Sequence, residues 1–263
     1  MSTFALIDAS DVSLNLDGQT ILHHVTLQLD AGEMLGLIGP NGAGKSSLLK
    51  IIAGILDPTS GNLCLQGRPV RDLPDQDRAR RIAYLAQAGT AHWPISVERV
   101  VALGRLPHLG SWRNASTADR RVIERALQQT GLVALAGRPF TTLSGGEKAR
   151  VLLARALAVE PLVMLADEPV AALDLAHQLE VMDLLRAHCD AGGAALVVLH
   201  DLRLAAHYCD RLQLLHRGET LATGRPELVI SNANLRHAYG VEIRHQAGSL
   251  MQAFALTWSK TGE

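Results

Sequence analysis

The chain has 263 residues, enough for one or two domains with a sizeable hydrophobic core. Hydrophobic residues make up 48% and charged residues 19%, a composition that argues against wholesale disorder. The 25 basic and 26 acidic residues give a formal net charge of -1, and aromatic residues are only 3%. Both values argue against a protein that coats DNA or stacks on single-stranded nucleic acid.

The first elements predicted along the chain are antiparallel strands. Apolar and polar residues alternate over 12–16 and again over 25–29, and Asp17-Gly18 between them is a turn signal. A short apolar strand at 34–38 then runs into a glycine-rich loop. The segment 46–53, which follows this loop, is typical of a helix.

The rest of the chain alternates between helical and strand patterns. A strand at 82–85 is followed by a helical region, in which Ser116 or Thr117 caps a helix that ends at Gly131. After Ser144 the predicted elements are a helix to about residue 159, a strand at 162–166, a helix at 176–188, a strand at 194–199 and a further helix. This alternation predicts an α/β fold with a parallel sheet and crossover helices.

The glycine-rich loop carries the strongest chemical signal. It reads Gly39-Pro40-Asn41-Gly42-Ala43-Gly44-Lys45-Ser46 and fits the phosphate-loop pattern G-x-x-x-x-G-K-[ST]. Glycines let backbone N–H groups approach phosphate oxygens, and the helix N-terminus adds partial positive charge. Lys45 can reach the β- and γ-phosphates, and the Ser46 hydroxyl can bind Mg²⁺. A plain glycine-rich turn is the structural alternative, but the strand–loop–helix context favours nucleotide binding.

A second motif narrows the choice among phosphate-loop proteins, which include kinases, GTPases, helicases and transport ATPases. Leu143-Ser144-Gly145-Gly146-Glu147 fits a capping box at the start of a helix. A simple cap does not need two glycines, which are costly in a first helical turn. They are expected where another backbone or a phosphate must come close. A small-molecule kinase has no use for such a segment.

With these motifs the chain resembles, over roughly residues 4–240, the ATP-binding subunit of ABC transporters. The resemblance implies a P-loop NTPase core with a parallel sheet, an N-terminal antiparallel β subdomain and a helical insert. It also implies a head-to-tail dimer, in which the Leu-Ser-Gly-Gly segment binds the γ-phosphate of ATP held by the second copy. The residues that it places around ATP are Gly39, Pro40, Asn41, Gly42, Ala43, Gly44, Lys45, Ser46, Ser47, Ser144, Gly145, Gly146, Glu147 and Asp174.

The resemblance also assigns catalytic chemistry to residues that follow predicted strands. Asp167 would hold Mg²⁺ through water, and Glu168 would act as general base on the attacking water. Gln87 would contact Mg²⁺ and this water, while His200 would donate to the γ-phosphate. Each residue alone has a commoner structural explanation: an exposed turn, a solvated loop glutamine or a structural histidine. The implied catalytic residues are Glu168, His200 and Gln87, and the implied metal ligands are Ser46, Gln87 and Asp167.

Four positions depart from the family's usual pattern. Ala171 stands where serine is usual in the D-loop, the segment in which Asp174 would cross the dimer interface. Val170 replaces a frequent threonine, and Ala149 replaces the usual glutamine after the signature. Leu16 stands where the family usually stacks an aromatic residue on adenine. None of the four changes removes a catalytic group.

One further segment suggests a subfamily. Val101-Ala102-Leu103-Gly104-Arg105-Leu106-Pro107-His108 resembles the V-x-x-G-R-x-P-H stretch of importers for iron-siderophores, haem and cobalamin. A helix terminator made by Gly104 and Pro107 is the structural alternative. The resemblance implies the ATP-hydrolysing subunit of a metal-chelate importer, with ATP and Mg²⁺ as cofactors. The alternative function is a soluble ABC ATPase that acts on a protein complex, such as one of iron–sulfur assembly.

The expected partners follow from the importer hypothesis. They are a second copy of the chain, two transmembrane permease subunits and, indirectly, a periplasmic substrate-binding protein, with no nucleic acid. The segment 88–107 is expected to dock on the permease, with Trp93, Val97 and Leu103 in or beside the groove.

The expected location is peripheral, on the cytoplasmic face of the inner membrane. No apolar run approaches 18 residues, the start lacks a secretory signal, and the three cysteines form no C-x-x-C pair, as expected in a reducing compartment. The expected domain division assigns 1–87 and 144–240 to the nucleotide-binding core, 88–143 to a helical subdomain and 241–263 to a C-terminal extension.

Overall fold

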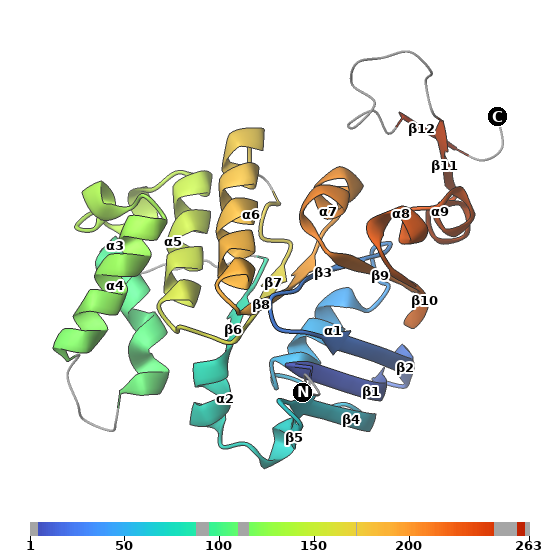
Figure 1. Ribbon diagram of the computed structural model, residues 1–263, viewed down its shortest axis with the longest axis horizontal. Coiled ribbons are helices and arrows are strands. Elements are labelled where there is room, and N and C mark those ends of the chain that lie inside the picture. Colours follow the sequence, from blue (N-terminus) through green and yellow to red (C-terminus); the bar gives the residue numbers. More distant parts are fainter. Residues whose placement is uncertain (1–4, 88–94, 110–115, 172, 245–256, 261–263) are drawn as a thin grey trace.

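A six-stranded sheet forms the centre of the computed structural model, which describes residues 5–87, 95–109, 116–171, 173–244 and 257–260. Every neighbouring pair of its strands is parallel except the edge pair β10 and β9. In spatial order the strands are β10 (Glu219–Gly224), β9 (Arg211–His216), β3 (Met34–Ile38), β8 (Ala194–Val198), β7 (Val163–Asp167) and β6 (Ile82–Leu85). Figure 1 shows most of the longer helices on one side of this sheet, and a second sheet with helix α1 (Lys45–Ile52) on the other side.

Both faces of the parallel strands are buried, which explains their nearly continuous apolar sequences. In β3, Leu35 and Leu37 point into one core, whereas Met34 and Ile38 point into the other. The first core lies against the antiparallel sheet and helix α1 (Lys45–Ile52), and the second lies against the helices that follow β6 in the chain. The strand that leads into the phosphate loop is therefore held between two packed layers.

The second sheet is antiparallel, in the order β2-β1-β4-β5. Its strands are β1 (Ile7–Leu16), β2 (Gln19–Leu29), β4 (Ser60–Leu65) and β5 (Arg68–Pro69). Asp17 and Gly18 connect β1 to β2, both with positive φ angles, as the turn signal predicts. A separate two-stranded sheet near the C-terminus pairs β11 (Val241–Arg244) with β12 (Thr257–Lys260).

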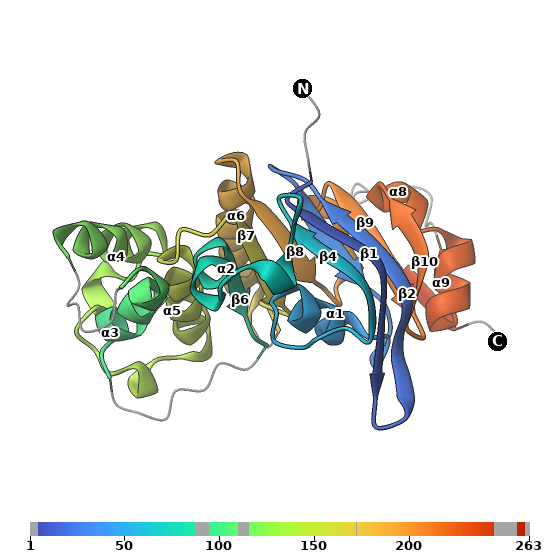
Figure 2. The ribbon, with the colours of Figure 1, turned by 90° about the horizontal axis from the view of Figure 1, so that it is seen from below.

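The helices complete the fold, and Figure 2 shows α3, α4 and α5 together to one side of the sheets. Besides α1, the α-helices are α2 (Asp75–Arg81), α3 (Val97–Ala102), α4 (Thr117–Gln129), α5 (Gly145–Leu157), α6 (Leu175–Asp190), α7 (Leu202–Tyr208), α8 (Pro226–Val229) and α9 (Asn232–Tyr239). The short 3₁₀ helices are η1 (Val70–Asp72), η2 (Leu103–His108), η3 (Val133–Leu135) and η4 (Phe140–Thr142). None of the described helices is long and apolar enough to cross a membrane.

The α/β fold predicted from the sequence, with its parallel sheet, antiparallel β region and helical insert, is confirmed. The helix predicted at 176–188 is α6 at Leu175–Asp190, within two residues at each end. The first two strands are longer than predicted: β1 begins at Ile7, not residue 12, and β2 begins at Gln19, not residue 25. The β9–β10 hairpin is not among the elements predicted from the sequence. Gln213 interrupts the apolar pattern of β9, yet it is only 1% exposed. Its burial is tolerated because its side-chain amide donates hydrogen bonds to Thr26 O and Thr220 Oγ1. The division of the chain at residues 88, 144 and 241 stays a prediction.

Candidate functional site

The predicted site residues lie at one edge of the parallel sheet. The phosphate loop follows β3, Glu168 follows β7, His200 comes shortly after β8, and Gln87 comes shortly after β6. Because these strands run parallel, their carboxyl ends meet at the same edge, where α/β proteins bind their ligands. The sheet thus gathers residues that are far apart in the sequence.

The phosphate loop begins at a position that only glycine fits. Gly39 has a φ of 147°, and a Cβ atom there would lie 2.2 Å from the carbonyl oxygen of Leu215 in β9. The loop backbone is therefore pressed against a neighbouring strand, which fixes its start. At its other end Gly44 is the N-cap of α1, with no side-chain cap, so the first backbone N–H groups of α1 are left for an anion.

Lys45 is buried beneath this loop and is only 6% exposed. Its Nζ donates to the carbonyl oxygens of Gly39 at 2.7 Å and Pro40 at 2.8 Å. Burial lowers the pKa of Lys45 from its usual value, while the nearby carboxylates of Glu168 and Asp167 oppose that shift. The ammonium group is thus held at the start of the loop, in the position from which a lysine can bind phosphate oxygens.

Ser46 and Asp167 form the part of the site suited to a metal ion. The Ser46 hydroxyl donates to Asp167 Oδ1 at 3.0 Å, and Asp167 is 4% exposed. Among the described residues no three His, Cys, Asp or Glu side chains gather into a metal-binding cluster. A hydroxyl with a single carboxylate is a donor set that suits Mg²⁺, which at nucleotide sites completes its shell with phosphates and water. These residues therefore fit the ion.

Tyr84 is a residue at this position that the sequence analysis missed. Its hydroxyl donates to Asp167 Oδ2 at 3.1 Å, so both oxygens of the carboxylate have a partner. Burial and the charge of Asp167 raise the pKa of Tyr84 well above its usual range, so the phenol stays a donor. In the sequence, the only indication of this role is a tyrosine hydroxyl near the end of the otherwise apolar strand β6.

Glu168 is held between two donors from the neighbouring strand ends. Gln87 Nε2 lies within hydrogen-bond distance of Glu168 Oε2, and His200 Nε2 lies within that distance of Oε1. The Glu168 side chain is 16% exposed, and its backbone has a φ of 51°, unusual for a residue other than glycine. The structure thus brings together Gln87, Glu168 and His200, a carboxylate placed to act as a base with two groups that orient it.

The signature segment forms a capped helix start with an open face. Ser144 is the N-cap of α5: its Oγ accepts from Glu147 N at 3.3 Å, and its own N–H donates to Glu147 Oε2 at 2.7 Å. Hydrogen bonds from the backbone N–H and the side chain of Ser144 to the carboxylate lower the pKa of Glu147. Ser144 and Gly145 are exposed, and a Cβ atom on Gly145 would meet nothing within 4 Å. The capping box and an approachable helix N-terminus therefore exist together.

The second glycine of the signature has a partner that the sequence analysis missed. A Cβ atom on Gly146 would lie 2.9 Å from the ring of His177, so a larger residue would displace this ring. His177 also binds Asp174, the N-cap of α6, through its backbone N at 3.0 Å and its Nδ1 at 2.7 Å. Both bonds lower the pKa of Asp174. His177 thus connects the D-loop to the signature segment. In the sequence, the Asp-x-x-His spacing is what indicates a contact between Asp174 and His177.

Two of the departures from the family pattern line one cavity. This cavity of about 190 Å³ is bounded by Gln87, Glu168, Gly145, Ala149 and Ala171, together with six other residues. The alanines at 149 and 171 leave space between the carboxylate and the signature helix. Longer side chains at these positions would fill part of it.

Tyr239, near the end of the described chain, also contacts the phosphate loop. It is the last residue of α9 and hydrogen-bonds to the backbone of Gly39. Burial raises the pKa of Tyr239 to about 12, so the hydroxyl remains protonated. No motif surrounds this residue, which explains why it was missed.

Leu16 is 42% exposed and pairs with Gln19 at the end of β1. Its place against adenine stays a prediction, with a direct test. An aromatic ring adds about 0.5–1.5 kcal/mol beyond area burial when it stacks. We expect Leu16→Tyr to tighten ATP binding by up to about tenfold and to improve selection against GTP. Titration of the unmodified protein and the Leu16→Tyr variant with ATP and GTP measures these affinities. If the variant binds ATP no more tightly than the unmodified protein, Leu16 does not lie against the adenine base.

The phosphate loop, the buried lysine and the two acidic residues at the end of β7 define a P-loop nucleotide-binding protein. The sequence matches the ABC transporter family over residues 22–171, more than half of the chain. The chain belongs to this family. It is an ATP-binding subunit with ATPase activity.

Similar proteins extend the match along most of the chain. Hemin import ATP-binding protein HmuV of Pseudomonas putida is 44% identical over 232 residues, covering 86% of this chain and 89% of that protein. The protein of the same name from Streptomyces coelicolor is 44% identical over 234 residues, covering 89% and 83%. Among solved structures, cbiO1 of Clostridium perfringens, part of the transporter complex cbiONQ, has a TM-score of 0.78 at 27% identity, covering 89% of this chain and 94% of that one.

A second solved structure shows the fold over nearly the full length. It is a metal-chelate type ABC transporter in an inward-facing conformation, with a TM-score of 0.82 at 24% identity. The match covers 97% of this chain and 95% of that one.

Proposed function

We propose that this chain hydrolyses ATP to drive the import of a metal chelate, haem in particular, through separate transmembrane subunits. ATP hydrolysis is supported mainly by the Glu168 carboxylate, which Gln87 and His200 hold in place. Close to it lie the groups suited to phosphate and Mg²⁺: Lys45, Ser46 and Asp167. The cargo rests on the 44% identity to hemin import proteins over most of both chains. The ligand itself would not touch this chain.

In the proposed mechanism the backbone of the phosphate loop and Lys45 bind the phosphates of ATP. Ser46 and Asp167, with Gln87, would hold Mg²⁺, which neutralises phosphate charge when bound. Glu168 accepts a proton from the attacking water, because its carboxylate is partly shielded from solvent and fixed on both sides. The N–H of His200 holds Glu168 in this structure and would turn to donate to the γ-phosphate once ATP is bound.

The second half of each ATP site would come from a second copy of the chain, arranged head to tail. Support comes from the exposed Ser144 and Gly145 at the N-terminus of α5, where an anion is favoured. The D-loop offers a second contact, since Asp174 caps α6 beside Leu175, a leucine that is 68% exposed.

The permease would dock beside the helical part of the chain. Leu103 and Leu106 are 43% and 57% exposed and line a groove of about 350 Å³ together with Tyr84 and Pro107. Val97, expected in or beside this groove, is completely buried and has a packing role instead. Trp93 and the rest of 88–94 lie outside the described residues. Leu106, which was not singled out from the sequence, is the more exposed leucine of the groove.

Charged substitution in this groove is expected to uncouple transport. Leu103→Glu and Leu106→Glu should leave the basal ATPase rate unchanged, because both side chains are exposed and neither belongs to the residues placed around ATP, and should abolish cargo-stimulated hydrolysis. The matched control is Val133→Glu in η3, where the valine is 59% exposed and does not line the groove. Stimulation that survives both leucine substitutions would show that the permease docks elsewhere.

The cargo is tested in proteoliposomes that contain the chain with its permease and binding protein. We expect haem to stimulate ATP hydrolysis and to accumulate inside, whereas a ferric siderophore and cobalamin do not. Stimulation by one of these compounds instead would reassign the cargo within metal chelates. Recovery of the chain in a soluble protein complex, with none in the membrane fraction, would favour the alternative of a soluble ABC ATPase.

A further inference from the structure

The segment Gly104–His108 is a motif that the ATP site does not use. It forms most of the 3₁₀ helix η2, and one side of this helix packs against the end of α5. A Cβ atom on Gly104 would lie 2.2 Å from the carbonyl oxygen of Arg155, so η2 and α5 touch backbone to backbone. Such close contact explains the glycine better than a helix stop does.

The buried side chain of Arg105 binds to two helices, α4 and the end of α5. This residue is 7% exposed, and its Nε donates to Asp119 Oδ1 in α4 at 2.9 Å. Its Nη1 donates to the carbonyl oxygen of Ala158 at 2.9 Å and to Glu160 Oε2 at 3.0 Å, both directly after α5. One guanidinium group therefore binds three acceptors from two sides, a geometry that its planar set of donors favours.

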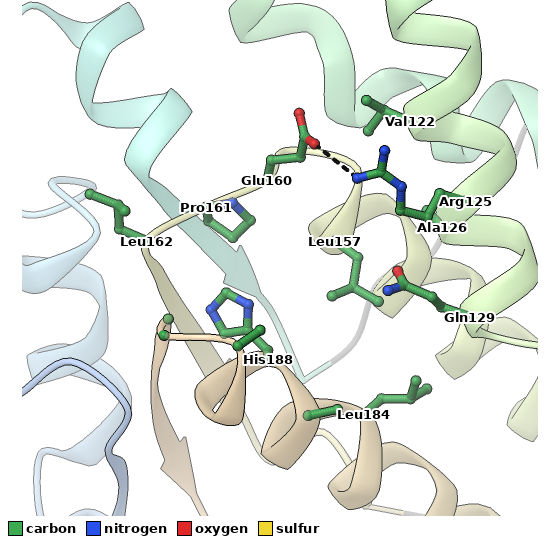
Figure 3. A pocket seen from close by; sticks show the side chains of 14 residues that line it. Val122, Arg125, Ala126, Gln129, Leu157, Glu160, Pro161, Leu162, Leu184 and His188 are labelled. Atoms are coloured by element: carbon green, nitrogen blue, oxygen red, sulfur yellow. Dashed lines mark ion pairs between the residues drawn. The ribbon is translucent and has the colours of Figure 1, made fainter.

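The two carboxylates around Arg105 are themselves held in place. Hydrogen bonds from Ser116 and Arg105 lower the pKa of Asp119 to about 2, so this side chain remains ionised near neutral pH. Glu160 has a φ of 53° and also lies 3.6 Å from Arg125 Nη1. Figure 3 shows this second pair at the surface of the cavity between α4, α5 and α6.

The rest of the motif adds contacts on both sides of η2. His108 Nε2 lies 2.8 Å from the carbonyl oxygen of Val159, again at the end of α5. The carbonyl oxygen of Pro107 accepts from Gln76 at 2.9 Å and from Arg80 at 2.8 Å, both in α2. The inward positions of η2 are thus bonded to three helices, whereas Leu103 and Leu106 remain exposed on its outer side.

The helix that Arg105 holds is the one that begins with the signature. α5 has 13 residues, or about 20 Å at 1.5 Å per residue, and runs from the Ser144 cap to Ala158. A helix of this length moves largely as a rigid body, so a shift at its C-terminal end also displaces Ser144 and Gly145. A buried ion pair is a weak source of net stability, because desolvation offsets much of the attraction. The ion pair between Arg105 and Asp119 is therefore better explained by the fixed geometry that it gives to the helices than by added stability.

We propose that Arg105 is a positioning residue, which fixes the C-terminal end of α5 so that Ser144 and Gly145 meet the ATP held by the second copy. Through the same contacts, force on the exposed Leu103 and Leu106 reaches the signature helix. The proposal rests on the proposed function, since it needs the head-to-tail dimer.

The first test replaces Arg105 with lysine, whose ammonium group keeps the charge but lacks the planar spread of donors by which Nε and Nη1 reach acceptors on two sides. We expect kcat to fall by about 10- to 100-fold, as misplacement of about 1 Å can produce, while ATP affinity of the monomer stays unchanged. Glu160→Ala changes a side chain that is 46% exposed, so it is expected to disturb folding less than a substitution of the buried Arg105. It should also lower kcat. The matched control is Arg125→Gln, which removes only the outer partner of Glu160 and should leave kcat unchanged.

The second test separates positioning from stability. In a Glu168→Gln background, ATP-dependent dimer formation is followed by sedimentation, with and without Arg105→Lys, and thermal unfolding of each monomer is measured. We expect Arg105→Lys to weaken the dimer at an ATP concentration that saturates the folded monomer. Normal dimer formation and normal kcat per folded molecule in Arg105→Lys and Glu160→Ala would overturn the proposal, whatever the melting temperature. No ATP-dependent dimer in Glu168→Gln alone would instead refute the dimer of the proposed function.

Discussion

The Glu168→Gln variant is expected to bind ATP normally and to hydrolyse it about 10²–10⁴-fold more slowly, the usual contribution of a positioned base. Glutamine preserves the size of the side chain and its place between Gln87 and His200, but it cannot accept the proton of the attacking water. Because hydrolysis ends the dimer's lifetime, the variant should accumulate as an ATP-bound dimer. Single-turnover hydrolysis and sedimentation with ATP measure both effects.

A matched carboxyl-to-amide change controls for the loss of charge alone. Glu180→Gln affects a side chain that is 50% exposed and pairs with Arg150 at 3.5 Å, away from the phosphate loop. It should hydrolyse ATP at the normal rate. Turnover of Glu168→Gln within a few-fold of the unmodified protein would exclude Glu168 as the base and leave His200 as the group to examine.

The Ser144→Arg variant is expected to lose ATP hydrolysis while each monomer still binds ATP. Ser144 is exposed at the start of α5, so an arginine would occupy the space that the second copy's γ-phosphate needs. The phosphate loop of the same chain remains intact, and monomer affinity for ATP should not change. Nucleotide titration and steady-state hydrolysis separate the two properties. Full activity in this variant would contradict the proposed shared site.

Mixing two inactive variants tests the head-to-tail arrangement more sharply. Lys45→Ala removes the buried ammonium group of the phosphate loop, whereas Ser144→Arg blocks the signature. In a mixed dimer one composite site carries both defects and the other carries neither. An equal mixture should therefore regain about a quarter of normal activity if the two sites work independently. Lack of any recovery would show that the sites do not work independently or that each chain completes its own site.

The sequence by itself determined the local parts of this protein. The phosphate loop from Gly39 to Ser46, the strand before it and the helix after it are encoded in consecutive residues, and the structure contains them. The capping box of Ser144 and Glu147 is equally local, because both partners lie within one helical turn. The resemblance to a family then assigned roles to Asp167, Glu168 and His200, which short motifs mark.

Only the tertiary structure decided which of these residues meet. Ser46 and Asp167 are 121 positions apart, yet the parallel pairing through β3, β8 and β7 brings the Ser46 hydroxyl to 3.0 Å from the carboxylate. The same sheet places Gln87 and His200 on the two oxygens of Glu168. Side-chain periodicity indicates which face of an element is buried, but strand order along a sheet depends on long-range packing.

The roles of Arg105 and His177 show the same limit. In the sequence Arg105 belongs to a motif that suggests a subfamily, and its burial among Asp119, Ala158 and Glu160 becomes visible only when α4 and α5 pack against η2. His177 is an ordinary residue of a predicted helix until α6 brings its ring against Gly146. Residues close together in the chain determined the phosphate loop, the carbonyl partners of Lys45 and the caps, whereas packing between distant elements determined the partners of the Asp167 and Glu168 carboxylates. The physical reason is that a local motif specifies its own backbone, while a buried charge needs a partner that only the folded chain supplies.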